Sequence, residues 1–319
     1  MSEPNIFYEA GIEAAEIEPK PKRKRRTKAE MGKAIKVDKF VEVMPAKVDK
    51  SPKAIDGTNV TRMDTRDGRF YEVVDNDGVI KHYPSVTTVL KAFPSDYLAQ
   101  WRGNVGNEEA DRVFKEAGER GTFIHKSFED LLTGTAFHYR EIPAGQRGFV
   151  IDDQTLFIQL YRLAEFMRLV NPIVLASEQI VYNHEYEFAG TIDMLLDIED
   201  GQYAINGRNP VYLPKGVYLV DIKTANSIHQ THHWQLGAYA HCLTAFGYII
   251  KGTIILHTRS LNKGGIEGFG AKLRSQNEWK EDFYNFLKVK SVFDINPKKP
   301  QIFNIPITIQ LSKNYMKEL

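Results

Sequence analysis

The feature that most constrains the fold is a series of three apolar, strand-like runs, at 173–182, 186–198 and 217–224. Asp193 lies inside the second run and Asp221 inside the third, and Lys223 follows Asp221 by two positions. Because side chains alternate along a strand, Asp221 and Lys223 should point to one face and Ile222 to the other. Burying two carboxylates and an ammonium group is costly unless other charges compensate them. A divalent cation together with a phosphate group would supply both signs of charge.

Apolar periodicity around these runs predicts the order helix, three strands, helix, strand. The expected helices cover 107–132, 153–169 and 227–246, and the fourth strand covers 248–257. The first helix should bury an apolar stripe made of Val113, Ala117, Ile124, Phe128 and Leu131. A polar stretch that contains several Gly and Pro residues, at 199–216, separates the second strand from the third. We therefore expect an α/β fold with a mixed central sheet of about four strands flanked by helices.

The segment before the first long helix predicts a small N-terminal unit. The fold should begin near Gly68 with a β-hairpin that turns at Asp75–Gly78. PSVTTVL follows, and Ser85 or Thr87 would cap a short helix there. We expect this helix to open an N-terminal helical part at 84–135.

Both ends of the chain differ in composition from its middle. Residues 1–60 lack sustained apolar periodicity and contain the basic run KPKRKRRTK, from Lys20 to Lys28. Like charges repel, so we expect a disordered basic tail, either simply solvated or acting as a nucleic-acid-binding arm. The folded domain should cover 61–319 and end in an extension at 259–319, with a helix near 279–287 and a strand near 302–311.

Composition narrows the cellular setting. No apolar run approaches the ~20 residues that span a bilayer, and the acidic N-terminus lacks a signal-peptide core. Cys242 is the only cysteine, so no intrachain disulfide can form, which fits a reducing compartment. We expect a cytoplasmic protein of a bacterium or a phage-infected host, or a nuclear or mitochondrial one if the source is eukaryotic. No phosphate-loop motif is present, so no helicase motor is expected.

The acidic residues suggest a particular metal chemistry. Mg²⁺ prefers oxygen ligands, which Asp193, Asp221 and the backbone carbonyl of Ile222 would supply. His125, on the preceding helix, would add an imidazole, which also suits Mn²⁺. Lys223 would then orient a nucleophile and offset charge on phosphorus. An isolated Asp-x-Lys pair is usually a surface ion pair worth ~0–1 kcal/mol. A metal site is indicated only because these residues occur together and in this order along the chain.

The ordered motifs RGTFIH, EQIVYN, GTIDML, DIKT and QLGAY resemble the PD-(D/E)xK nuclease superfamily, in its RecB-type exonuclease branch. PSVTTVL also resembles a segment of the mitochondrial genome-maintenance exonucleases and related phage exonucleases. The resemblance covers roughly Phe70 to His257. It implies a restriction-endonuclease-like core.

The resemblance also implies roles for individual residues. It makes His125, Asp193 and Asp221 the metal ligands and Lys223 the catalytic lysine. Glu178 matches the acidic position on the first strand. Four further residues would contact DNA: Gln235 and Tyr239, which share a helix face one turn apart, and Arg120 and Thr122, which flank the histidine. Arg120 is equally well explained as a solvated surface charge.

Two features of the sequence are not explained by the resemblance. The insertion at 199–216 is longer than the connection in related enzymes, and it should affect substrate entry rather than metal geometry. Four histidines, His229, His232, His233 and His241, suggest either a zinc site or a polar helix face near DNA. The single cysteine cannot hold the four-cysteine iron–sulfur cluster of some relatives.

The expected activity is therefore a Mg²⁺- or Mn²⁺-dependent DNA exonuclease that acts on single strands or DNA ends. The resemblance implies products with 5′-phosphate and 3′-hydroxyl ends, in recombination, repair or replication. The expected partners are DNA and recombination or replication proteins. Three alternatives remain: an endonuclease of the same superfamily, an inactive DNA-binding module of the same fold, and a zinc-dependent interaction protein.

Overall fold

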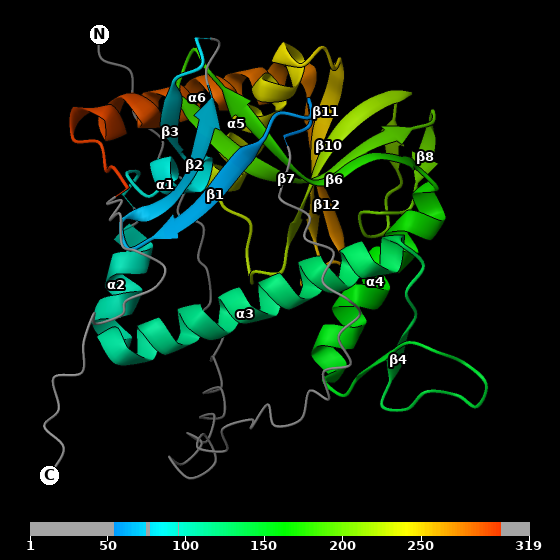
Figure 1. Ribbon diagram of the computed structural model, residues 1–319. Coiled ribbons are helices and arrows are strands. Elements are labelled where there is room, and N and C mark those ends of the chain that lie inside the picture. Colours follow the sequence, from blue (N-terminus) through cyan, green and yellow to red (C-terminus); the bar gives the residue numbers. More distant parts are fainter. Residues whose placement is uncertain (1–53, 75–76, 95, 301–319) are drawn as a thin grey trace, which may run out of the picture. The chain divides into compact units, whose positions relative to one another are not determined.

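The computed structural model describes residues 54–74, 77–94 and 96–300 (Figure 1). The basic run at 20–28 and the strand expected near 302–311 lie outside these residues. None of the helices in the described ranges is both long and apolar enough to span a membrane.

A mixed sheet of five strands forms the centre, in the order β12-β11-β10-β7-β6. The strands are β6 (Ile173–Asn183), β7 (Phe188–Ile198), β10 (Gly216–Lys223), β11 (Ile250–His257) and β12 (Gly270–Ser275). Within this sheet only β10 and β11 pair in parallel, and helix α5 (Gln230–Ala245) makes the crossover that such a pair requires. The expected α/β class with a mixed sheet is confirmed. The count of about four strands was one short, because β12 lies in the segment expected as an extension.

Helices cover both faces of the sheet, and the buried side chains of its strands alternate between two apolar clusters. Leu195, Leu219 and Ile255 join the cluster that contains α5 and α6 (Gln276–Ile295). Their chain neighbours Leu196 and Val220 join the cluster of α3 (Asn107–Leu132) and α4 (Gln154–Val170). Figure 1 shows the two helix pairs on opposite sides of the sheet. Charged side chains on the sheet are therefore shielded from solvent wherever a helix packs over them.

The long helices match the sequence expectation in position but only partly in burial. Helix α3 spans the expected range, yet it buries Ile124 and Phe128 while Ala117 is exposed. The expected stripe was therefore wrong in the N-terminal half, which packs on α2 (Asp96–Val105) through the ring of Phe114 rather than on the sheet. Helix α4 begins after Asp153, whose carboxylate accepts two backbone N–H groups.

A separate three-stranded antiparallel sheet precedes α3. It consists of β1 (Val60–Thr65), β2 (Gly68–Val74) and β3 (Ile80–Pro84), so the expected hairpin is confirmed. The fold starts earlier than Gly68, since β1 and the buried Ala54 precede it. Ser85 caps α1 (Val86–Leu90) by accepting the backbone N–H of Thr88, as expected.

Two short strand pairs lie in the connections between the main elements. The insertion at 199–216, expected only as a polar connection, contains the antiparallel pair β8 (Gly201–Tyr203) and β9 (Val211–Leu213). Between α3 and α4, β4 (Phe137–Tyr139) pairs in parallel with β5 (Phe149–Ile151).

Candidate functional site

Five elements supply the candidate site residues, from α3 (Asn107–Leu132) to α5 (Gln230–Ala245). Helix α3 carries His125, β6 carries Glu178 and β7 carries Asp193. Strand β10 ends with Asp221, Ile222 and Lys223, and α5 carries Gln235 and Tyr239 one turn apart.

His125, Glu178 and Asp193 form one cluster. The Nδ1 atom of His125 lies 3.4 Å from Asp193 Oδ1 and 3.6 Å from Glu178 Oε1. One ligand atom from each residue lies within 4.8 Å of the others, so the three could hold one metal ion. We call this group the His-Glu-Asp cluster. It is the only group of three such residues in the described ranges.

The peptide groups at Ile222 link this cluster to β10. The Ile222 carbonyl accepts a hydrogen bond from His125 Nε2 at 3.2 Å, and the Ile222 N–H donates to Asp193 Oδ2 at 2.6 Å. A proton on Nε2 leaves the lone pair of a neutral imidazole on Nδ1, which faces the two carboxylates. The donor set is therefore oriented as a cation would require.

Electrostatics in the cluster favour an added positive charge. Burial alone would lower the pKa of His125, but Asp193 and Glu178 outweigh burial and raise it to about 10. Burial would raise the pKa of Asp193, but His125 and Lys223 lower it. The carboxylates can be compensated either by a proton on His125 or by a divalent cation, and these two would compete.

Asp221, Lys223 and Gln235 form a second group beside the first. Lys223 Nζ lies 2.9 Å from Asp221 Oδ1 and 2.8 Å from Oδ2, and it donates to Gln235 Oε1 at 3.3 Å. Gln235 Nε2 donates to Asp221 Oδ1 at 3.4 Å. We call this group the Asp-Lys-Gln cluster. It confirms that Asp221 and Lys223 share one face of β10.

Asp221 is the residue of this second cluster that best suits a cation. Its Oδ2 atom is buried and makes no hydrogen bond of good geometry within the described part of the chain, despite its short contact with Lys223. Burial raises the pKa of Asp221 to about 6, and the charge of Lys223 only partly opposes this. For Lys223, burial is outweighed by Asp221 and Asp193, which raise its pKa and keep it charged. Asp221 lies outside the His-Glu-Asp cluster, and its role as a metal ligand stays a prediction.

Glu178 reaches the site through an unusual backbone conformation. The register of β6 and β7 pairs Ser177 with Met194 and Gln179 with Ile192, which places Glu178 opposite Asp193. Glu178 has φ of 50°, a left-handed conformation that costs of order 1–3 kcal/mol for a residue other than glycine. Such strain is typical of positions where a side chain is held in a functional orientation.

One glycine allows close approach beside the site. A Cβ on Gly190 would lie 2.2 Å from Cε1 of the Tyr239 ring, so the glycine of GTIDML leaves room for that ring. A Cβ on Gly121 would meet Thr224 Oγ1 at 3.5 Å, an ordinary van der Waals contact, so that position does not require glycine. Tyr239 is almost fully buried, and burial raises the pKa of its hydroxyl.

Several predicted residues lie outside both clusters. Arg120 and Thr122 stand on α3 before His125, but neither makes a hydrogen bond or ion pair with another candidate residue in the described ranges. Their contact with DNA stays a prediction. The histidines at and along α5 are dispersed: the rings of His229, at the N-cap, and His232 meet edge to face, whereas His241 stacks on Phe283.

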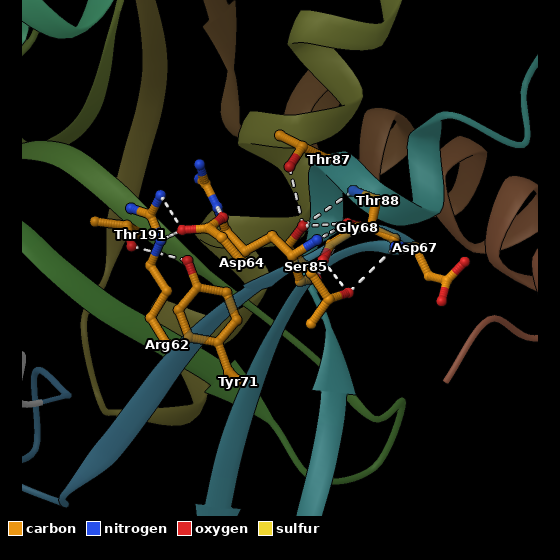
Figure 2. Close-up of polar contacts among 11 residues, drawn as sticks. Arg62, Asp64, Asp67, Gly68, Tyr71, Ser85, Thr87, Thr88 and Thr191 are labelled. Carbon is orange, nitrogen blue, oxygen red and sulfur yellow. Dashed lines mark hydrogen bonds and ion pairs between the residues drawn. The ribbon is translucent and has the colours of Figure 1, made fainter. Parts of the chain in front are cut away.

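Sequence reasoning missed one set of residues next to the site. Tyr71 on β2 is fully buried, and its hydroxyl lies 2.9 Å from Thr191 Oγ1, beside Gly190 (Figure 2). The alternation in RFYEVV indicates which side chains share the face of Tyr71, but nothing local shows where that face docks. Comparison with known protein families and with curated proteins finds no match for this chain.

Proposed function

We propose that this chain is a metal-dependent DNA nuclease with a restriction-endonuclease-like core of the PD-(D/E)xK type. The observation that carries the proposal is the adjacency of the His-Glu-Asp and Asp-Lys-Gln clusters at one end of β10. An imidazole, three carboxylates and a lysine from four elements meet there, and the link through Ile222 fixes one cluster against the other.

The donor set fits Mg²⁺ or Mn²⁺ better than a soft metal, because it offers carboxylate oxygens and one imidazole but no thiolate. His125, Glu178 and Asp193 would hold the ion, with the spare acceptor capacity of Asp221 Oδ2 available on the other side. When bound, such an ion activates water and stabilises negative charge on phosphorus.

The protein's own residues would position the phosphate. Lys223 has three N–H donors, and Asp221 and Gln235 use two of them. The third has no hydrogen-bond acceptor among the described residues and would donate to a phosphate oxygen or to the attacking water. Because Asp221 and Asp193 keep Lys223 protonated, its charge would offset the charge that builds up in the transition state. Gln235 holds Lys223 and Asp221 in place from α5.

Exonuclease action on single strands or DNA ends is the form of activity that the motif resemblance favours. The test is digestion of end-labelled single- and double-stranded DNA with Mg²⁺, with Mn²⁺ and with a chelator. We expect metal-dependent degradation of linear strands and no cleavage of a closed circle. Cleavage of the circle would identify an endonuclease instead.

Two substitutions test the residues. Lys223→Met and Asp193→Asn should each lower kcat by at least about 100-fold. The first removes a positive charge beside the reacting phosphate, and the second weakens the site that would hold the metal ion. Arg168→Gln, which removes an ion pair of α4 on a surface away from the site, is the matched control and should keep full activity. Wild-type rates in Lys223→Met or Asp193→Asn would refute the assignment.

A further inference from the structure

The N-terminal sheet carries a row of polar side chains on one face. The register of β1 and β2 pairs Arg62 with Tyr71 and Asp64 with Arg69. Paired residues of an antiparallel sheet, and residues two apart on one strand, point to the same side. All four side chains therefore share one face. Figure 2 labels Arg62, Asp64 and Tyr71 of this row.

This face points toward the candidate site. Tyr71 contacts Thr191 Oγ1 at 2.9 Å, and Thr191 stands two positions before Asp193 on β7. Burial would lower the pKa of Arg69, but its hydrogen bond and ion pair with Asp64 outweigh burial and raise it. Arg69 shares the face of Tyr71, so it stands on the side of this sheet that meets β7.

Asp64 accepts hydrogen bonds from both Arg62 and Arg69 but occupies only some of their N–H donors. Its Oδ1 accepts from Arg69 Nε at 2.9 Å, while its Oδ2 accepts from Arg62 Nε at 2.9 Å and lies 2.8 Å from Nη2. Each guanidinium has five N–H donors, so within the described part of the chain most of them remain for another acceptor. The side chains of Arg62 and Arg69 are 39% and 36% exposed, which leaves them accessible. Two cations and one anion give this row a positive balance.

We propose that Arg62 and Arg69 bind phosphodiester groups of the DNA strand that occupies the candidate site, and so hold the strand beside the bond to be cut. This inference deepens the proposed function and rests on it. A guanidinium matches a phosphate with two parallel hydrogen bonds, which an ammonium cannot do. Asp64 pre-orients both forks, and Tyr71 anchors the row to β7 through Thr191.

The test measures binding without hydrolysis. The full chain is titrated, in buffer with a chelator, against a fluorescent single-stranded oligonucleotide that has no terminal phosphate, at several salt concentrations. Each phosphate contact on a single strand contributes about 0.7 to the slope of log affinity against log salt. Arg62→Gln and Arg69→Gln should each lower the slope by about that amount, and the double variant by about twice as much. Arg168→Gln should leave the slope unchanged.

A lysine series separates phosphate binding from a purely structural role. Arg69→Lys and Arg62→Lys keep the charge but lose the fork, so they should restore the salt slope and recover only part of the affinity. These variants also carry the test if either glutamine variant fails to fold. Wild-type slopes in folded Arg62→Gln and Arg69→Gln, or no binding of single-stranded DNA by the wild type, would overturn the inference.

The outcome for the proposed function is read separately, from hydrolysis with metal. A chain that binds DNA through these arginines but never cuts it would refute the nuclease proposal and leave the phosphate site standing. A chain that cuts DNA while both glutamine variants keep wild-type affinity and KM would support the nuclease proposal and refute the phosphate site.

Discussion

Gly190→Ala should destabilise the protein because the new methyl group collides with the ring of Tyr239. The nearest ring atoms would lie 2.2 and 2.6 Å from the added Cβ, far inside van der Waals contact. Tyr239 is 4% exposed, so its ring has no free space to rotate into. Overpacking of this kind costs about 1–3 kcal/mol. Replacing a strand glycine by alanine otherwise gains about 0.5–1 kcal/mol, so the net loss should be about 0–2.5 kcal/mol.

A double-mutant cycle isolates the collision from other effects of the substitution. Tyr239→Leu removes the distal ring atoms and should by itself cost about 2–4 kcal/mol through lost packing. In that background the methyl group added by Gly190→Ala has no ring to meet, so its cost should vanish and the coupling energy should be about 1–3 kcal/mol. Urea unfolding of the four proteins, with a shared m-value, gives the free energies of unfolding. Additivity within about 0.5 kcal/mol would refute the explanation of this glycine.

The remaining predictions concern other parts of the chain. Gly237→Ala should destabilise the protein where α5 contacts α6, because its Cβ would lie 2.6 Å from the backbone nitrogen of Phe283. Gly118→Ala, on the open part of α3, should instead stabilise the protein by up to ~1 kcal/mol. Equal shifts of the thermal unfolding temperature in the two variants would contradict this. Burial lowers the pKa of His232 to about 3, below its unfolded value, so its neutral form stabilises the fold above pH 6.5 and that stability is lost as pH falls toward 3. His232→Gln should therefore flatten the fall in stability between pH 6.5 and 5 by up to about 2 kcal/mol, and an unchanged pH profile would show that His232 is solvated. Removing residues 2–50 should spare hydrolysis but reduce the salt slope of DNA binding, and equal slopes would mean that the basic run does not contact DNA.

The sequence predicted the parts of the structure that depend on local pattern. Alternation along β10 placed Asp221 and Lys223 on one face, and both lie in the Asp-Lys-Gln cluster. Apolar periodicity located α3, α4 and α5 because each has an amphipathic or buried pattern over several turns. Strands β1 and β12 were missed because short runs that mix charged and apolar residues, such as VTRMDT and GAKLRS, give no clear period.

Long-range docking could not be predicted from any local pattern. Nothing in the stretch around Arg69 and Tyr71 indicates that this face of a separate sheet meets Thr191, which follows more than a hundred positions later. The same holds for Glu178, whose position beside His125 depends on a left-handed residue and on the register of β6 with β7. Such features depend on how whole sheets meet rather than on the preference of one segment.

The hydrogen bonds on both sides of Ile222 make the site sensitive to register. If β10 slipped by one residue, Asp221 and Lys223 would move to the opposite side of the sheet, and His125 and Asp193 would lose their backbone partners together. The proposed nuclease, assembled this way, would stay inert during synthesis and partial folding. The proposed capacity to cut nucleic acid would appear only with the completed native sheet.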